Sequence, residues 1–173
     1  DTIASDVLAF LSTQRVPRHR IHVFVANQRE RREYRAAIDR AGYSDLSIVV
    51  GEKGVDKQLV RIQQHFPEGA HVVWLNDKVK GIYSKLSKNS GATPLGIGFF
   101  ECLIHHAYDL MQSEGAALWG LNKSLRQHCL AEHTVSRKLG LVPFCACGFL
   151  NRRLPIKYSG RILDSEFTLR AWE

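Results

Sequence analysis

The fold class of this chain is decided by the stretch Gly69-Ala70-His71-Val72-Val73-Trp74-Leu75-Asn76-Asp77-Lys78. It is an apolar run that ends abruptly on a carboxylate. Such a run, bounded by glycine and by polar residues, predicts a buried β-strand with Asp77 just beyond its carboxyl end. Open α/β sheets bind ligands at that edge, so Asp77 is a candidate for holding a metal ion or a phosphate.

The residues before this stretch predict a repeating α/β pattern. Apolar residues recur at helical spacing over 3–12, 28–41 and 55–66, and short β-branched runs lie at 21–26 and 46–50. Gly42 ends the second of these helices, and Pro67-Glu68-Gly69 ends the third. Two strands and two helices leading into the strand at 70–75 predict right-handed crossovers and a parallel core.

The residues after this stretch are less regular. Helical spacing predicts a helix over 79–86 and a long helix over 98–113, with a loop at 88–94 between them. Apolar runs at 116–120 and 141–150 predict strands that are reached through loops, which favours a mixed sheet. We therefore expect one α/β domain over residues 1–173, with a mixed sheet that is parallel in its amino-terminal half and has helices on both faces.

Length and composition agree with a single domain. A chain of 173 residues can bury roughly 70% of its unfolded surface without disulfides. The 24 Lys and Arg exceed the 17 Asp and Glu, and the net charge of +7 favours anionic partners, although a soluble basic domain of any function can carry such a charge. We expect reduced, structural thiols rather than a zinc site or disulfides from the cysteines, which form one C-x-C but no C-x-x-C: Cys102, Cys129, Cys145 and Cys147.

Targeting signals are missing from the sequence. It has no secretory signal and no apolar run approaching 18 residues, so we expect an intracellular domain with no membrane partner. Because it begins at Asp1 without an initiating methionine, we also expect a domain excised from a longer protein whose flanking domains are its partners.

Common nucleotide-binding fingerprints are absent. The sequence contains neither G-x-G-x-x-G nor G-x-x-x-x-G-K-[ST], which argues against a Rossmann dehydrogenase and a P-loop NTPase. Asp77 remains, either as a ligand for a divalent cation or as the cap of a following helix. Weaker candidates are a metal cluster of His128, Cys129 and His133, and a basic patch that contacts an acidic acceptor or is simply solvated: Arg152, Arg153, Lys157 and Arg161. The neighbours His105 and His106 point about 100° apart on a helix, so they cannot hold one metal together, and we expect a partly buried histidine instead.

The order of several segments resembles the GT-A glycosyltransferases. These are I-H-V-F-V-A-N at 21–27, G-V-D-K-Q-L-V-R-I-Q-Q-H-F at 54–66, V-V-W-L-N-D at 72–77, L-W-G-L-N at 118–122 and D-S-E-F-T-L-R-A-W at 164–172. More narrowly, the chain looks like the TET/JBP-associated group, which is linked to modified DNA bases and has a relative in the vertebrate oestrogen-induced growth regulator family. The resemblance covers roughly residues 20–173. It implies a UDP-sugar donor, a hydroxyl acceptor on protein or modified nucleic acid, a nuclear location and a link to transcription regulation.

The resemblance also implies roles for individual residues. Asp77 would bind Mn²⁺ or Mg²⁺ and thereby the donor diphosphate, and Glu166, with Asp164 near it, would supply the general base for the acceptor hydroxyl. The nucleotide base would be contacted by Val25, Ala26 and Asn27, and the sugar or diphosphate by Lys57, Gln58 and Arg61. The floor between donor and acceptor would be formed by Trp119 and Gly120.

Two motifs depart from the family pattern. Asn76 and Lys78 flank Asp77 where further acidic residues are expected, and Phe167 follows Glu166 where the family has an acidic residue. Lys78 could neutralise the diphosphate in place of the metal. Two hypotheses follow: a glycosyltransferase that moves glucose or N-acetylglucosamine, and a degenerate transferase fold retained as a binding or scaffold module. A nucleic-acid-binding domain is a third, weaker possibility.

Overall fold

The computed structural model describes residues 3–85, 89–122, 142, 145–157 and 163–172, with the side chains of 163, 164 and 172 left out. The amino-terminal part contains a π-helical turn Ala4–Leu8, helix α1 (Ala9–Thr13), a 3-10 turn Arg18–Arg20, strand β1 (His22–Val25), helix α2 (Gln28–Arg40), strand β2 (Ser47–Val50), helix α3 (Val55–His65) and strand β3 (His71–Leu75). The rest contains strands β4 (Tyr83–Ser84) and β5 (Thr93–Pro94), helix α4 (Phe99–Ser113), strands β6 (Leu118–Gly120) and β7 (Ala146–Leu150) and helix α5 (Leu163–Trp172). The expected α/β class is confirmed.

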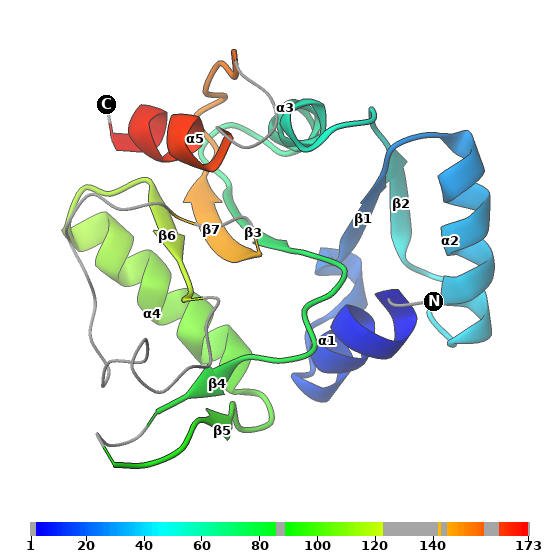
Figure 1. The fold of residues 1–173 in the computed structure, drawn as a ribbon, viewed down its shortest axis with the longest axis horizontal. Coiled ribbons are helices and arrows are strands. Elements are labelled where there is room, and N and C mark those ends of the chain that lie inside the picture. Colours follow the sequence, from blue (N-terminus) through cyan, green and yellow to red (C-terminus); the bar gives the residue numbers. More distant parts are fainter. Residues whose placement is uncertain (1–2, 86–88, 123–141, 143–144, 158–162, 173) are drawn as a thin grey trace.

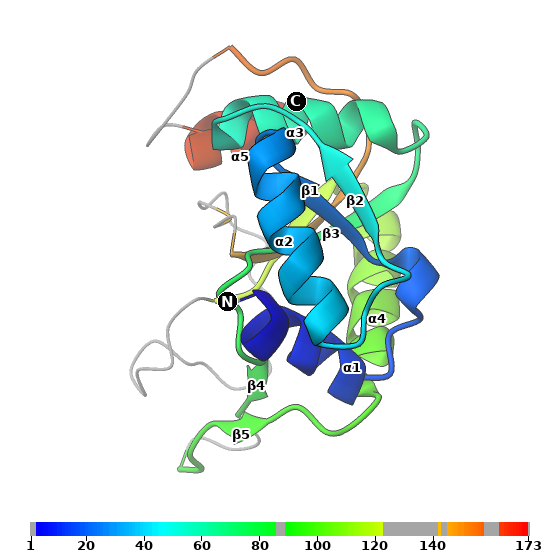
Figure 2. The same cartoon turned by 90° about the vertical axis from the view of Figure 1, so that its right-hand side faces the viewer.

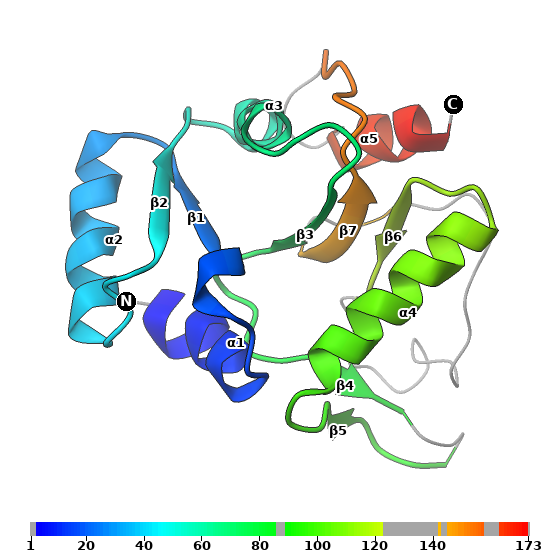
Figure 3. The same ribbon diagram turned by 180° about the vertical axis from the view of Figure 1, so that it is seen from behind.

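The main strands form two hydrogen-bonded sheets. Strands β1 and β2 pair in parallel, with His22 opposite Ser47 and Val25 opposite Val50. Strand β7 lies between β3 and β6 and is antiparallel to both. Across the molecule the order is β2, β1, β3, β7 and β6, as Figures 1 and 3 show.

Two hydrophobic clusters connect these sheets with the helices. Alternate residues of β1 point to opposite faces, as a strand requires. Val23 and Val25 join a cluster that contains Ile38 of α2 and is packed against Leu75 of β3. Phe24 packs instead against the cluster formed by residues of α3, β3, β7 and α5: Leu59, Ile62, Val72, Phe149 and Phe167. Helices α2 and α3 therefore cover opposite faces of β1, and Figure 2 shows α2 in front of the parallel pair.

The predicted three-stranded parallel core was wrong in one respect. Within the described residues β3 belongs to the antiparallel sheet and shares no hydrogen-bonded ladder with β1 or β2. Its contact with β1 is through side chains, since Val73 and Leu75 pack against the cluster that contains Val23 and Val25. Apolar periodicity indicates a strand and its buried face, but the hydrogen-bonding neighbour of β3 is β7, which lies some 75 residues later in the chain.

The predicted helix over 79–86 was also wrong for its described residues 79–85. The amide of Lys78 donates to Asn76 Oδ1 at 3.0 Å, and that of Val79 donates to the Asn76 carbonyl at 3.0 Å, so Asn76 closes a turn. The chain then continues without helix into β4, which pairs with β5. Val79 and Ile82 still reach the first hydrophobic cluster, which satisfies their apolar pattern without a helix. Asp77 consequently caps no helix here.

Candidate functional site

The carboxyl ends of β1, β2 and β3 gather several of the expected site residues. We use the name carboxyl edge for Asn27, the loop 51–54 and the turn 76–78, which directly follow these strands. The amide of Gly51 donates to the Val25 carbonyl at 2.8 Å, so the ends of β1 and β2 lie together. Helix α2 links this pair to β3, because the hydroxyl of Tyr34 lies 3.5 Å from Asp77 Oδ2.

Polar groups at the end of β1 start helix α2. Asn27 Oδ1 accepts a hydrogen bond from the Glu30 amide at 3.0 Å, and Glu30 Oε2 accepts one from the Ala26 amide at 2.8 Å. This is a variant of the capping box, in which the glutamate reaches one residue further back than usual. The side chain of Val25 is buried, so only exposed Asn27 and half-buried Ala26 offer a side-chain surface to a ligand.

Glycines shape the loop between β2 and α3. A methyl group on Gly51 would overlap the carboxamide of Gln58, so the loop backbone lies directly against α3. Gly54 precedes the helix with φ at +113°, and no side chain in the described part of the chain caps the amino end of α3. Exposed Lys57 forms an ion pair with Glu52 at 3.4 Å. The helix amino terminus thus has no side-chain cap, which favours anions, but the carboxylate of Asp56 lies in its first turn next to Gly54.

Gln58 and Arg61 complete this side of the edge. Gln58 Oε1 is buried without a hydrogen-bond partner among the described residues, while the stem of Arg61 approaches Gly51 and its side chain is exposed. Arg61 therefore presents a second cation next to the loop 51–54.

Asp77 stands on the α2 side of the edge. Its carboxylate is near the Tyr34 hydroxyl, and the pKa of Tyr34 is raised first by burial and then by the negative charges of Asp77 and Glu30. Lys78 is exposed beside it, so a carboxylate and an ammonium group follow β3 together.

The donor set at Asp77 is small. Among the described residues no group of three His, Cys, Asp or Glu side chains gathers at one point. Mg²⁺ is commonly held by one or two carboxylates together with substrate phosphates and water. Among the described residues, Asp77 therefore fits a cation that a bound diphosphate helps to hold.

Trp119 is directed to the other end of β3. Its indole lies over Gly148, and its Nε1 donates to His71 Nε2 at 2.8 Å. His71 is the first residue of β3, whereas Asp77 follows the last. Gly120 is exposed, next to Val142. The structure does not bring Trp119 to the carboxyl edge.

Glu166 is likewise outside the carboxyl edge. It is buried in α5, and its Oε1 accepts hydrogen bonds from the Lys157 amide at 2.8 Å and from Arg170 Nε at 3.0 Å. The side chain of Asp164 lies outside the described residues. Figures 1 and 3 place α5 beside α3, while the chain after β3 runs toward α1 and β4. In this arrangement Glu166 connects α5 to the segment 151–157.

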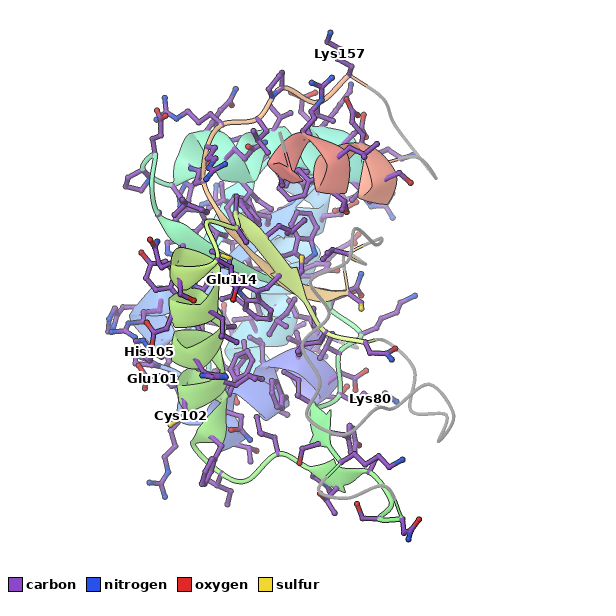
Figure 4. All side chains as sticks on the ribbon, turned by 90° about the vertical axis from the view of Figure 1, so that its left-hand side faces the viewer. Lys80, Glu101, Cys102, His105, Glu114 and Lys157 are labelled. Atoms are coloured by element: carbon purple, nitrogen blue, oxygen red, sulfur yellow. The ribbon has the colours of Figure 1, made fainter. Side chains whose placement is uncertain are left out.

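The weaker candidates lie on the surface or outside the described residues. His105 is exposed on α4, 3.7 Å from Glu101, and its neighbour His106 is exposed too (Figure 4). Lys157 projects into solvent in Figure 4. Arg152 and Arg153 are also exposed. The cluster of His128, Cys129 and His133, like Arg161, lies outside the described residues. No disulfide joins the three cysteines in the described part of the chain: Cys102, Cys145 and Cys147.

Sequence reasoning missed two contributors to the edge. Glu30 follows Asn27 by three residues, which is capping-box spacing and could have been recognised. Tyr34 belongs to the apolar face of α2, and no local signal separates a tyrosine that only packs from one whose hydroxyl reaches a carboxylate 43 residues away.

Comparisons with known proteins add no relative. No protein family, curated protein or solved structure matches the chain. In the described residues, no helix has the length and apolar character needed to cross a membrane.

Proposed function

We propose that this chain is a nucleotide-sugar-binding domain of GT-A type that holds a UDP-sugar at the carboxyl edge. One observation carries the proposal. Asn27, the open amino end of α3 and the Asp77-Lys78 pair all follow strands β1, β2 and β3, and Tyr34 joins α2 to Asp77. Strands β1 and β3 belong to separate hydrogen-bonded sheets, but their side chains pack together, so β2, β1 and β3 lie in that order with α2 and α3 on opposite faces of β1. In α/β folds with this strand order, ligands bind beyond the carboxyl ends of the strands.

The charges suit a nucleoside diphosphate. The helix amino end and Arg61 offer positive potential on one side of the edge, where Lys57 is paired with Glu52, and Lys78 offers an ammonium group on the other. A diphosphate bound there would also meet the carboxylate of Asp56 in the first turn of α3. Asp77 would hold Mn²⁺ or Mg²⁺ against the diphosphate, and the bound cation would stabilise charge on the leaving UDP. Lys78 supplies a positive charge without a metal. Asn27, with an exposed amide, is the side chain we assign to the nucleotide base.

The activity proposed for this site is transfer of a glucose or N-acetylglucosamine unit to a hydroxyl on protein or modified nucleic acid. The bond between the anomeric carbon and the UDP oxygen breaks, and a bond to the acceptor oxygen forms. The acceptor proton requires a base, the role assigned to Glu166 or Asp164. Glu166 lies outside the carboxyl edge, so this assignment requires it to leave its bonds with Arg170 and the Lys157 amide and to approach the bound donor.

The competing proposal is a degenerate transferase fold that binds nucleotide or protein partners without turnover. The observation that favours it is the environment of Glu166, a buried carboxylate tied to Arg170 and to a backbone amide. A carboxylate held by two hydrogen bonds must give them up before it can take a proton from an acceptor hydroxyl. Under this proposal the domain belongs to a larger regulatory protein in the nucleus.

Calorimetric titration with UDP, UDP-glucose and UDP-N-acetylglucosamine, each with and without Mn²⁺, tests donor binding. We expect Lys78→Ala to weaken UDP binding about tenfold, or about 1.4 kcal/mol. Lys80→Ala is the matched control, since Lys80 is another exposed lysine two residues further on and should bind UDP like the wild type. Absence of binding by the folded wild-type chain, or equal losses in both variants, would contradict the proposed site.

Turnover separates the two proposals. Release of free sugar from UDP-glucose or UDP-N-acetylglucosamine by the wild-type chain, and its loss in Asp77→Asn, would favour the transferase. UDP binding without any turnover on added acceptors would favour the binding module.

A further inference from the structure

Two histidines meet at the opposite end of β1 from the carboxyl edge. His22 is the first residue of β1, and His65 is the last residue of α3. His65 Nε2 lies 3.2 Å from His22 Nδ1, close enough for one ring to donate a proton to the other. This pair is independent of the proposed nucleotide site and uses none of its residues.

Aromatic neighbours hold both imidazoles in place. The ring of His22 meets Phe66 edge to face at a centroid distance of 5.1 Å, and the ring of His65 meets Phe24 in the same way at 5.3 Å. The two imidazoles are themselves 5.0 Å apart with an interplanar angle of 66°. Because Phe24 and Phe66 pack against the second hydrophobic cluster, the backbone on each side of the pair is anchored in the core.

The separation of the two nitrogens suits chelation of one ion. Metal–imidazole bonds are about 2.0–2.1 Å long, so nitrogens 3.2 Å apart subtend about 100–105° at a shared metal. That angle lies between the ~90° of an octahedral site and the ~109° of a tetrahedral one. For both lone pairs to face the ion, each ring would have to turn within its aromatic contacts, and the ion would take the place of the hydrogen bond between the two nitrogens.

Access from solvent also favours metal binding. His65 is exposed, so an ion can reach the pair from solvent. Among the described residues no further His, Cys, Asp or Glu completes a group of three there, which leaves coordination positions for water or an external ligand.

We infer that His22 and His65 form a two-histidine site for a divalent transition-metal ion of the zinc type. Imidazole nitrogen selects Zn²⁺, Cu²⁺ and Ni²⁺ over the oxygen-seeking Mg²⁺ and Ca²⁺. The ion connects the start of β1 to the end of α3, two elements otherwise joined here through ring packing. Binding therefore stabilises the folded chain as well as presenting an ion with open positions.

The test is calorimetric titration of the whole chain with ZnCl₂, together with thermal unfolding with and without Zn²⁺. His65→Gln and His22→Gln each remove one ligand, whereas His19→Gln removes an exposed imidazole just before β1 and is the matched control. We expect the wild type and His19→Gln to bind one Zn²⁺ and to unfold at a higher temperature with it. Both ligand variants should lose that binding and that shift while keeping the circular dichroism of the zinc-free wild type.

Two results would overturn the inference. One is a folded wild-type chain that binds no Zn²⁺. The other is Zn²⁺ binding that survives unchanged in both His22→Gln and His65→Gln, which would assign the ion to other residues of the chain. A MgCl₂ titration should give no binding that depends on these histidines, because Mg²⁺ requires oxygen ligands.

Discussion

Asn151 offers a stringent test of how the chain is held together between β7 and α3. It is fully buried, and its Nδ2 donates to the carbonyls of Gln63, Phe66 and Pro67 at 2.9, 3.0 and 3.0 Å. Its backbone amide and carbonyl bond the turn before β3, through Ala70 and Gly69 respectively. One side chain thus satisfies the carboxyl end of α3, whose last carbonyls have no partner within the helix.

We predict that Asn151→Asp destabilises the fold strongly and in a pH-dependent way. The new carboxyl group has the same shape, but its oxygen would face three carbonyl oxygens, so it must be protonated in the folded state. Protonating a group of pKa about 3.9 at about pH 7 costs roughly (7.0 − 3.9) × 1.36, or about 4.2 kcal/mol. Losing one donated hydrogen bond adds about 1 kcal/mol. The expected loss is about 5 kcal/mol at pH 7, comparable with the whole stability of many domains.

Urea unfolding of Asn151→Asp and wild type at several pH values measures this loss. The folded variant binds a proton that the unfolded chain releases, so its deficit should shrink by about 1.4 kcal/mol per unit as the pH falls from about 7 toward 4. Asn89→Asp places the same charge in an exposed turn and should show no such dependence. A deficit below about 1 kcal/mol at neutral pH, or one that does not change with pH, would refute the orientation assigned to this amide.

Two further predictions concern the bond between Trp119 and His71. Gly148→Ala would place a methyl group in the volume of the Trp119 indole, so we expect it to lower the free energy of unfolding by about 1–3 kcal/mol, measured by thermal unfolding. Gly91→Ala is the control, because its methyl group meets no atom within 4 Å and should leave the stability nearly unchanged. Equal effects of the two substitutions would contradict the packing of Trp119 on Gly148. Burial, and then the neighbouring His105, lowers the pKa of His71 below its usual 6.5, so the unfolded chain binds more protons there. The free energy of unfolding should therefore be highest above about pH 6.5 and should fall as the pH drops below that value. This fall should be less steep in His71→Gln. An unchanged pH profile in that variant would show that His71 does not cause the fall.

Much of the local structure could be predicted because its determinants are neighbours in the chain. Helices α2 and α3 follow apolar spacing, and Gly42, with φ at +80°, follows Ala41, the C-cap residue of α2. Within the candidate site, Asp77 could be assigned to a strand end in the same way. Strand identity and strand end are properties of a few consecutive residues, so no distant contact was needed.

The sequence predictions failed where a segment could adopt two conformations that its local sequence allows equally well. Val79 and Ile82 have helical spacing, but the turn closed by Asn76 and their packing against the first cluster keep the chain out of a helix. The role of Glu166 depends similarly on distant partners, although Arg170 four residues later was a readable sign of a helical ion pair.

The sequence by itself therefore determined the alternation of strands and helices, their buried faces and the position of an acidic residue at the end of β3. Only the tertiary structure decided that β3 pairs with β7, that Tyr34 reaches Asp77, that Trp119 bonds His71, and that His22 meets His65. The physical reason is range. Periodicity and capping act within a few residues, whereas these contacts form between positions 43 or more residues apart, and their formation depends on the packing of the whole chain.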